Sequence, residues 1–280
     1  MLEDDYTYVM RKALKGLALS PSEAAARAGL PEQDVLALSR GEFSEAAALQ
    51  LAPALGLRPA AFAAHPGYHP APLSSPFIQR LELPFEDGHV NAWLIRKHDT
   101  SILFDTGSNK NSCYEALKAL GLQTVTAIFV THAHPDHVGG LPSLRKKVRI
   151  CYGANDIKGA RNAKLGDNFH FDSLKVKVID LRGHADPARG YLVGGLETPV
   201  LVTGDALFAG SIGGCPDPAA YTLAHRLLRR TLARLPGETI ILPGHGPATT
   251  LAEECAGNPF DLFTASAPSE PRSPTTPDRK

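Results

Sequence analysis

The amino-acid sequence predicts an α/β domain preceded by a small all-helical unit. Residues 1–64 are rich in Ala and Leu at helical spacing, whereas short β-branched segments alternate with helical ones from residue 77 to residue 263. The segment 65–76 between them holds four prolines and a glycine, which is typical of a semi-rigid linker. The chain is therefore expected to consist of a helical domain (1–64), a linker (65–76) and an α/β domain (77–263).

The helical unit carries start and stop signals for short helices. Ser20 and Ser22 precede Ala-rich runs and are expected N-caps. Gly29, Gly41 and Gly56 stand where helices would end.

Nine strands are expected in the second part, because these segments are short, β-branched and bounded by Gly, Pro, Asp or Asn. They are 77–85, 90–97, 101–107, 125–132, 147–153, 174–181, 190–195, 199–205 and 239–246. Helical patterns fall at 113–120, 137–147, 155–160 and 219–235. This mixture predicts sheets covered by helices.

Charge, apolar segments and cysteine content indicate which partners and which compartment to expect. The 29 basic and 29 acidic residues balance, so no overall charge recruits nucleic acid or an anionic membrane. We find no signal peptide and no apolar run of membrane-spanning length, and the four scattered cysteines suit a reducing compartment. We therefore expect a cytoplasmic protein without a membrane partner. The Pro- and Ser-rich segment 264–280 is expected to be a disordered tail.

Five of the eleven histidines fall in a pattern that predicts a metal site. The segment THAHPDHVGG follows an apolar strand and supplies His132, His134, Asp136 and His137. Imidazole and carboxylate groups are the usual ligands of zinc, and such a dense group is costly to keep without a cation. Three further strands end in a Gly-flanked turn that carries a ligand type, and these residues are His184, Asp205 and His245.

The order HxHxDH, then His, Asp and His resembles the metallo-β-lactamase superfamily. The resemblance implies an αββα sandwich over residues 77–263 with two divalent metal ions, zinc being expected and iron or manganese being alternatives. It implies that one ion is held by His132, His134 and His184, the other by Asp136, His137 and His245, and that Asp205 bridges them. A hydroxide between the ions would attack the substrate, and Asp136 would handle protons.

Within that superfamily the strongest local likeness is to glyoxalase II, carried by VNAWLI, GDALFAGSIGG and PGHGPATTLAEECAGNPF. The implied activity is hydrolysis of a small-molecule thioester of the acyl-glutathione type. A lactonase, another ester or phosphodiester hydrolase, and a persulfide dioxygenase with one iron on His132, His184 and Asp205 are the alternatives. The family usually has a basic residue after GDALFAGSIG, where this chain has Gly214 and Cys215.

Four residues near these segments are candidate substrate contacts, and packing in the core is the alternative for each. They are His89, Tyr191, Phe208 and Cys215. For Cys215, an inert buried thiol is the preferred interpretation, because no base is paired with it in the sequence.

The helical unit resembles the helix-turn-helix domains of Xre-type repressors, with the second helix near 21–28 and the recognition helix near 32–38. Residues 1–60 contain six basic and eight acidic residues, and the expected recognition helix carries Glu32 and Asp34 without a base-reading cation. We therefore do not expect binding of nucleic acid, and favour a lid or a homodimer contact. A DNA-binding sensor of a metabolite is the rival class of function.

Overall fold

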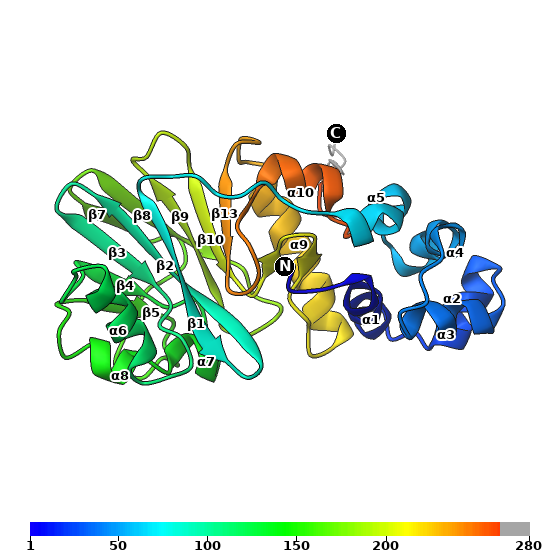
Figure 1. Ribbon diagram of the computed structural model, residues 1–280, viewed down its shortest axis with the longest axis horizontal. Helices are drawn as coiled ribbons and strands as arrows, with labels where there is room; N and C mark the ends of the chain where they lie inside the picture. The colour runs from blue at the N-terminus through cyan, green and yellow to red at the C-terminus, as the bar shows by residue number, and fades with distance from the viewer. Residues whose placement is uncertain (264–280) are drawn as a thin grey trace, which may run out of the picture.

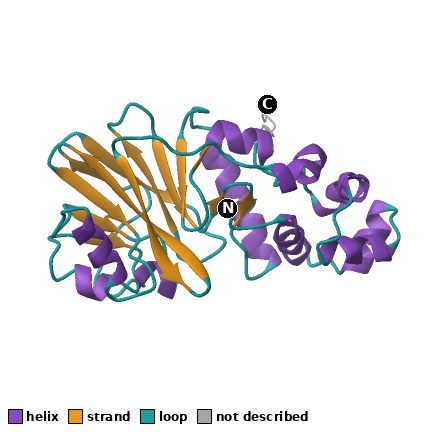
Figure 2. Ribbon diagram, in the orientation of Figure 1, coloured by secondary structure: helices purple, strands orange, loops and turns teal. Residues whose placement is uncertain are grey.

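The computed structural model describes residues 1–263, and the segment 264–280, expected to be a disordered tail, lies outside them. The molecule is elongated, with a two-sheet sandwich at one end and the helical unit at the other (Figure 1). Figure 2 shows the strands gathered in the sandwich, with helices beside them and along the opposite end of the molecule. Among the described residues, no helix has the length and apolar character needed to span a membrane.

The helical unit consists of five short α-helices and two 3-10 turns: α1 (Tyr6–Gly16), α2 (Pro21–Ala28), α3 (Glu32–Ser39), α4 (Glu45–Leu51), η1 (Ala52–Leu55), α5 (Pro59–Ala64) and η2 (His65–Gly67). Ser20 caps α2 in a capping box with Glu23, and Gly29 ends this helix in the left-handed conformation. Ser22 lies inside α2 and caps no helix. The local signals therefore set the bounds of α2.

The first sheet has the order β1 (Ile78–Phe85), β2 (Gly88–Lys97), β3 (Thr100–Phe104), β4 (Ala127–Phe129), β5 (Cys151–Gly153) and β6 (Arg161–Asn162). The strands β1, β2 and β3 are antiparallel, and the pairs from β3 to β6 are parallel. The helices α6 (Ser112–Ala119), α7 (Pro135–Val138) and α8 (Leu141–Leu144) follow its strands. Leu117 of α6 and Leu144 of α8 share an apolar cluster with Leu94 and Leu103 of the sheet.

The second sheet has the order β14 (Thr249–Thr250), β13 (Ile240–Pro243), β10 (Val200–Gly204), β9 (Arg189–Gly194), β8 (Leu174–Asp180) and β7 (Asn168–Phe171). A small ribbon is formed by β11 (Leu207–Phe208) and β12 (Ser211–Ile212). The helices α9 (Pro218–Leu232) and α10 (Leu251–Gly257) follow the strands of this half. Leu228 of α9 packs in the same cluster as Leu201 and Ile241 of the sheet.

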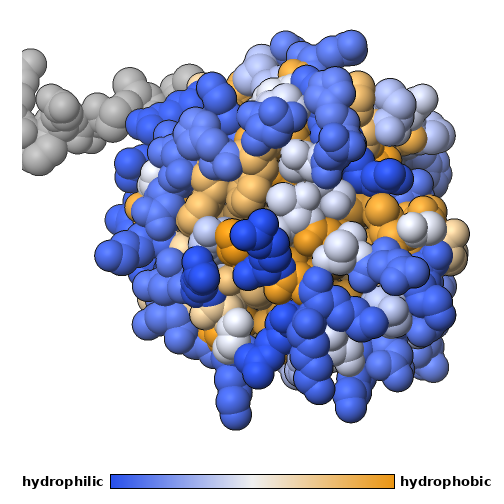
Figure 3. Space-filling view, turned by 90° about the vertical axis from the view of Figure 1, so that its left-hand side faces the viewer, coloured by the Kyte–Doolittle hydropathy of each residue, from blue (hydrophilic) through white to orange (hydrophobic). Residues whose placement is uncertain are grey.

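The inner faces of the two sheets form the central core. Alternate residues of one strand face opposite sides, so Ile102 and Phe104 belong to the core between the sheets while Leu103 packs under the helices. Helix, sheet, sheet and helix thus form four layers, which is the αββα sandwich expected from the sequence. At the end of the sandwich far from the helical unit, apolar side chains lie in the middle of a hydrophilic rim (Figure 3).

Two helical expectations were wrong. The segment 137–147 contains the end of α7 and all of α8, because the loop before α6 takes backbone groups between them. Thr106 N donates to His137 O at 2.9 Å, and Gly140 N donates to Gly107 O at 3.3 Å. The segment 155–160 forms turns. Five short strands, β6, β7, β11, β12 and β14, lie outside the nine expected segments, because two to four residues give too little periodicity to detect.

The helical unit and the sandwich share one apolar cluster. Val9 and Met10 of α1 belong to the same cluster as Tyr221 and Leu228 of α9. In addition, the backbone N–H of Arg58 donates to Pro259 O at 2.7 Å. The linker is held as well, because the Tyr68 hydroxyl donates to the buried carboxylate of Glu254 at 2.6 Å. The helical unit is therefore packed against the sandwich as part of one core.

Candidate metal centre

The ligand types project from loops that leave the ends of neighbouring strands. The segment 130–138 after β4 carries four of them, with His134 as the residue before α7. The loop from β8 to β9 carries His184, the end of β10 carries Asp205, and the end of β13 carries His245. Because the ends of β4, β8, β10 and β13 meet at one edge of the sandwich, residues far apart in sequence converge there.

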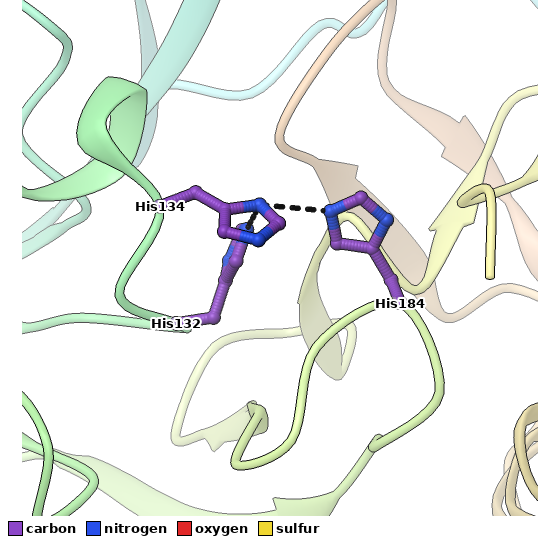
Figure 4. A group of neighbouring side chains, drawn as sticks. All are labelled: His132, His134 and His184. Carbon is purple, nitrogen blue, oxygen red and sulfur yellow. Dashed lines mark hydrogen bonds between the residues drawn. The ribbon is translucent and has the colours of Figure 1, made fainter. Parts of the chain in front are cut away.

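Three imidazoles form the first group. His134 Nδ1 lies 3.0 Å from His132 Nε2 and 3.0 Å from His184 Nε2. Figure 4 shows the three rings pointing toward one another, His132 and His134 from the loop after β4 and His184 from the opposite loop. His132 is buried, His184 half-buried and His134 exposed, so this group forms the open side of the site.

The second group contains two imidazoles and two carboxylates, and it is buried. His245 Nε2 lies 3.1 Å and His137 Nε2 lies 3.5 Å from Asp136 Oδ2. His137 Nε2 lies 3.3 Å from Asp205 Oδ1, and Asp205 Oδ2 is 3.6 Å from both His245 Nε2 and His184 Nε2. Asp205 therefore faces both groups. The four ligand atoms of this group lie within 4.8 Å of one another, as do the three of the first.

Several features of the site fit metal ions. His137 Nε2 and Asp205 Oδ1 are fully buried and make no hydrogen bond, although buried polar atoms nearly always have a partner. Gly244 leaves the space between them open, since a Cβ there would lie 2.1 Å from Asp205 Oδ1 and 2.7 Å from His137 Cε1. A divalent cation in contact with both atoms would satisfy them.

The outward-facing ring nitrogens are held by protein acceptors. The Nδ1 atoms of His132, His137, His184 and His245 lie within 2.8–3.1 Å of Thr131 Oγ1, Asp105 Oδ2, Gly214 O and His89 O. When Nδ1–H donates to such an acceptor, the lone pair of Nε2 is left to bind a metal. Four of the five imidazoles are therefore oriented with Nε2 toward the centre, and His134 offers Nδ1.

Burial and neighbouring charges hold the groups in defined protonation states. Burial lowers the pKa of His132 to about 2, which keeps this imidazole neutral, the form that binds a metal. Burial alone would raise the pKa of Asp205, but His137 and His245 hold it below its usual range. Burial opposes a charge on His137, yet the carboxylates of Asp205 and Asp105 raise its pKa well above the usual value. The second group thus favours positive charge at its centre.

Asp105 contacts a candidate ligand, His137, and sequence analysis did not single it out. Its carboxylate accepts hydrogen bonds from Thr131 N at 2.7 Å and Thr131 Oγ1 at 2.8 Å, and it holds His137 Nδ1 at 2.9 Å. The residue is buried with φ +59°, a left-handed backbone that is uncommon outside glycine. Its position directly after the buried strand β3, like that of the ligand types after their own strands, was the available signal.

The structure separates the four candidate substrate contacts. Phe208 lies beside the site, with its ring centroid 6.0 Å from that of His245. The side chain of His89 is exposed, while its backbone oxygen faces His245. Cys215 is buried, and burial raises the pKa of its thiol to about 11, in line with an inert cysteine. Tyr191 does not line the site: it is fully buried between the sheets, where its hydroxyl donates to Val130 O.

Comparison with known proteins indicates which superfamily has a similar sequence and fold. The family model of the metallo-β-lactamase superfamily matches residues 86–190. Among solved structures, ETHE1 from Myxococcus xanthus is 27% identical with a TM-score of 0.55, over 65% of this chain and 83% of that chain. The BLEG-1 B3 metallo-β-lactamase has a TM-score of 0.54 at 24% identity, over 65% of this chain and 98% of that chain. The chain has the metallo-β-lactamase fold, and the matches support that superfamily.

The curated relatives narrow the class to metallo-hydrolases. A probable metallo-hydrolase of Bacillus subtilis, YqgX, is 28% identical over 64% of this chain and 95% of its own length. A hydroxyacylglutathione hydrolase of Brucella ovis is 35% identical over 128 residues, which are 44% of this chain. The alignment spans only 48% of that hydrolase, about half of its length.

Proposed function

We propose that this protein is a hydrolase with two metal ions that cleaves thioesters of the acyl-glutathione type. The observation that carries the proposal is the convergence of seven ligand atoms in two groups that meet at Asp205. The similarity to a hydroxyacylglutathione hydrolase of Brucella ovis supports the substrate class.

In this proposal, His132, His134 and His184 would hold one ion, Asp136, His137 and His245 would hold the other, and Asp205 would be shared by the two groups. When bound, two divalent ions supply a deprotonated water as the nucleophile near neutral pH and stabilise negative charge on the acyl oxygen. We expect zinc, since imidazole and carboxylate ligands suit it, but iron and manganese accept the same ligands. TTHA1623, a di-iron-bound protein of this fold, is 27% identical with a TM-score of 0.50, over 69% of this chain and 100% of that chain.

Asp136 is the proposed proton-handling group. Although burial would raise its pKa, the neighbouring imidazoles of His137 and His245 hold that pKa far below the usual value, so the carboxylate stays ionised. Its Oδ2 atom lies 3.1 Å from His245 Nε2, and the other oxygen remains to accept a hydrogen bond from the attacking water. Asp136 would thus orient this water toward the acyl carbon.

A persulfide dioxygenase with one iron on His132, His184 and Asp205 is the second candidate. The observation in its favour is that these residues offer two imidazoles and one carboxylate, with His184 Nε2 3.6 Å from Asp205 Oδ2. The buried second group argues for two ions, because Nε2 of His137 and Oδ1 of Asp205 would otherwise have no partner. Metal content separates the two candidates. One iron per chain with oxygen uptake supports the dioxygenase, and two ions with thioester hydrolysis support the hydrolase.

The function of the helical unit as a lid or homodimer contact rather than a DNA reader stays a proposal. The helix α3, in the place of a recognition helix, has Glu32 and Asp34 in its first turn and no basic residue in its last turn. Negative charge at this position opposes contact with phosphate. Binding of random duplex DNA in a gel-shift titration at low salt would contradict the proposal.

The test of the catalytic proposal combines metal analysis with a substrate panel. The panel contains S-lactoylglutathione, a homoserine lactone, a phosphodiester and nitrocefin. We expect two ions per chain and hydrolysis of the thioester, whereas activity on the lactone or phosphodiester alone would refute the substrate class. His134→Ala should lose one ion and at least about 100-fold in kcat. The matched control His170→Ala changes an exposed histidine of β7 and should retain both.

A further inference from the structure

One wall of the metal site is formed by the helical unit. The segment before α1 passes directly over the loop after β13, since a Cβ on Gly246 would lie 3.0 Å from Glu3 N. Glu3 Oε2 lies 3.9 Å from Nδ1 of His245. The helical unit is therefore in contact with the surroundings of a metal-ligand residue.

The helix α1 places a lysine in this wall. The Lys12 ammonium pairs with the buried carboxylate of Asp4 and donates to Ile212 O at 2.8 Å. It also lies 4.9 Å above the ring centroid of Phe208. An ammonium has three N–H donors, and the oxygen atoms of Asp4 and Ile212 accept hydrogen bonds from two of them. The side chain is 16% exposed, so Lys12 is fixed in place while part of it still faces solvent.

Lys12 is linked to two residues of the proposed metal site, His245 and His184, through one intervening residue in each case. On one side, the ring of Phe208 is near both groups, with Lys12 Nζ 4.9 Å and the His245 ring centroid 6.0 Å from its centroid. On the other side, Lys12 Cε lies 3.8 Å from the position of a Cβ on Gly214, whose backbone oxygen holds His184 Nδ1 at 2.8 Å. The positive charge is therefore placed along the edge formed by β11, β12 and the residues that follow.

This edge has no cation of its own. Residues 205–216 contain no Lys or Arg, and Gly214 stands where the glyoxalase II-like pattern has a basic residue. Without a side chain at Gly214, the space beside it is open to Lys12. A cation missing from the local sequence is thus supplied from a helix about two hundred residues earlier in the chain.

We propose that Lys12 is a specificity-determining residue of the metal site, and that its ammonium binds a carboxylate of the substrate. The proposal rests on the proposed hydrolase function. A carboxylate accepts a charge-assisted hydrogen bond from the third N–H of Lys12, while Asp4 and Ile212 O hold the ammonium in place. The helical unit then contributes to substrate selection, which explains why it is packed against the sandwich.

The test compares a charged and a neutral substrate on the full-length, metal-loaded protein. S-lactoylglutathione carries the carboxylates, and its dimethyl ester has the same thioester without them. Lys12→Met should raise KM for S-lactoylglutathione about 10-fold, with kcat changed less than about twofold and KM for the dimethyl ester unchanged. Arg11→Met, which removes an exposed positive charge from the same helix, should leave both KM values unchanged.

A second variant separates substrate binding from a structural role. Asp4→Asn removes the counter-charge of Lys12, so KM for S-lactoylglutathione should fall about threefold. Loss of packing would instead weaken both variants in the same direction. Lys12→Arg retains the charge and should stay within about threefold of the wild-type KM. For each variant we compare KM for S-lactoylglutathione with KM for its dimethyl ester. If this ratio stays at the wild-type value in both Lys12→Met and Asp4→Asn, the proposal is overturned.

A binding measurement distinguishes failure of the Lys12 proposal from failure of the hydrolase proposal. If the wild-type protein hydrolyses neither substrate, calorimetric titration of the metal-loaded protein with glutathione tests Lys12 alone. We expect Kd to rise about 10-fold in Lys12→Met and to stay constant in Arg11→Met. Glutathione that does not bind the wild-type protein, or that binds Lys12→Met equally well, would overturn the role of Lys12.

Discussion

The contact between Gly16 of α1 and Tyr221 of α9 offers a sharp test of how the helical unit is joined to the sandwich. Gly16 is buried at the end of α1, and a Cβ there would lie 2.3, 2.4 and 2.6 Å from three ring carbons of Tyr221. In an open helix, Gly→Ala stabilises a protein by about 1 kcal/mol. Here the added methyl group must displace a packed ring, which costs about 1–3 kcal/mol.

For Gly16→Ala the cost of the clash should exceed the gain in helix propensity, because the added methyl group would overlap three carbon atoms of the Tyr221 ring. We expect a net loss of up to about 2 kcal/mol in the free energy of unfolding, which is the cost of the clash less the gain in helix propensity. Urea unfolding followed by the fluorescence of Trp93 measures it, because this only tryptophan is buried in the core between the sheets. A probe in the sandwich then reports a change made in the helical unit.

Two controls define the result. Gly237→Ala places its Cβ at an ordinary 3.6 Å from Ala252 and should change stability by less than about 1 kcal/mol. Tyr221→Leu removes the ring, so Gly16→Ala should cost less in its presence, as a double-mutant cycle would show. If the Trp93 transition of Gly16→Ala matches that of the wild type, the helical unit unfolds independently and the idea of a shared core is refuted.

Three further outcomes follow from the site and its surroundings. Asp105→Asn should weaken metal binding about 10- to 100-fold, because Asp105 holds the ring of His137. The control Asp172→Asn should not weaken it, since Asp172 is exposed and shares only the left-handed backbone, with φ +50°. Competition with a chelating dye measures metal binding by both variants. Removal of metal by a chelator should lower the free energy of unfolding by about 3 kcal/mol for each ion lost, at a metal concentration 100-fold above Kd, and an unchanged urea midpoint would contradict the metal proposal. Burial lowers the pKa of His225 to about 4, so the folded protein keeps this ring neutral while the unfolded chain takes up a proton below about pH 6.5. Stability should therefore fall by up to about 3 kcal/mol from pH 6.5 to pH 4, and the difference between wild type and His225→Phe in this range should vanish if the ring is not buried in solution.

The residues predicted sheets covered by helices and the side chains that come together in the two groups of candidate ligands, and the family resemblance implied the αββα layers. Strand periodicity is a local property, and ligand types placed directly after apolar strands must converge if those strands lie side by side. His132 and His245 could therefore be assigned to one site although they are far apart in the chain. The residues 21–28 could likewise be assigned to a helix, because Ser20, Glu23 and Gly29 are local capping signals.

Only the tertiary structure decided which other groups surround that site. Lys12 lies on an amphipathic helix in a different unit, and nothing in its local sequence indicates that it contacts Ile212 O. Tyr191 is close to the ligands in sequence, but the alternation of side chains along β9 directs it into the core. The break between α7 and α8 also depends on another loop, because Gly107 O of that loop accepts a hydrogen bond from Gly140 N. Periodicity and capping act over a few residues, whereas these contacts depend on the packing of segments from distant parts of the chain.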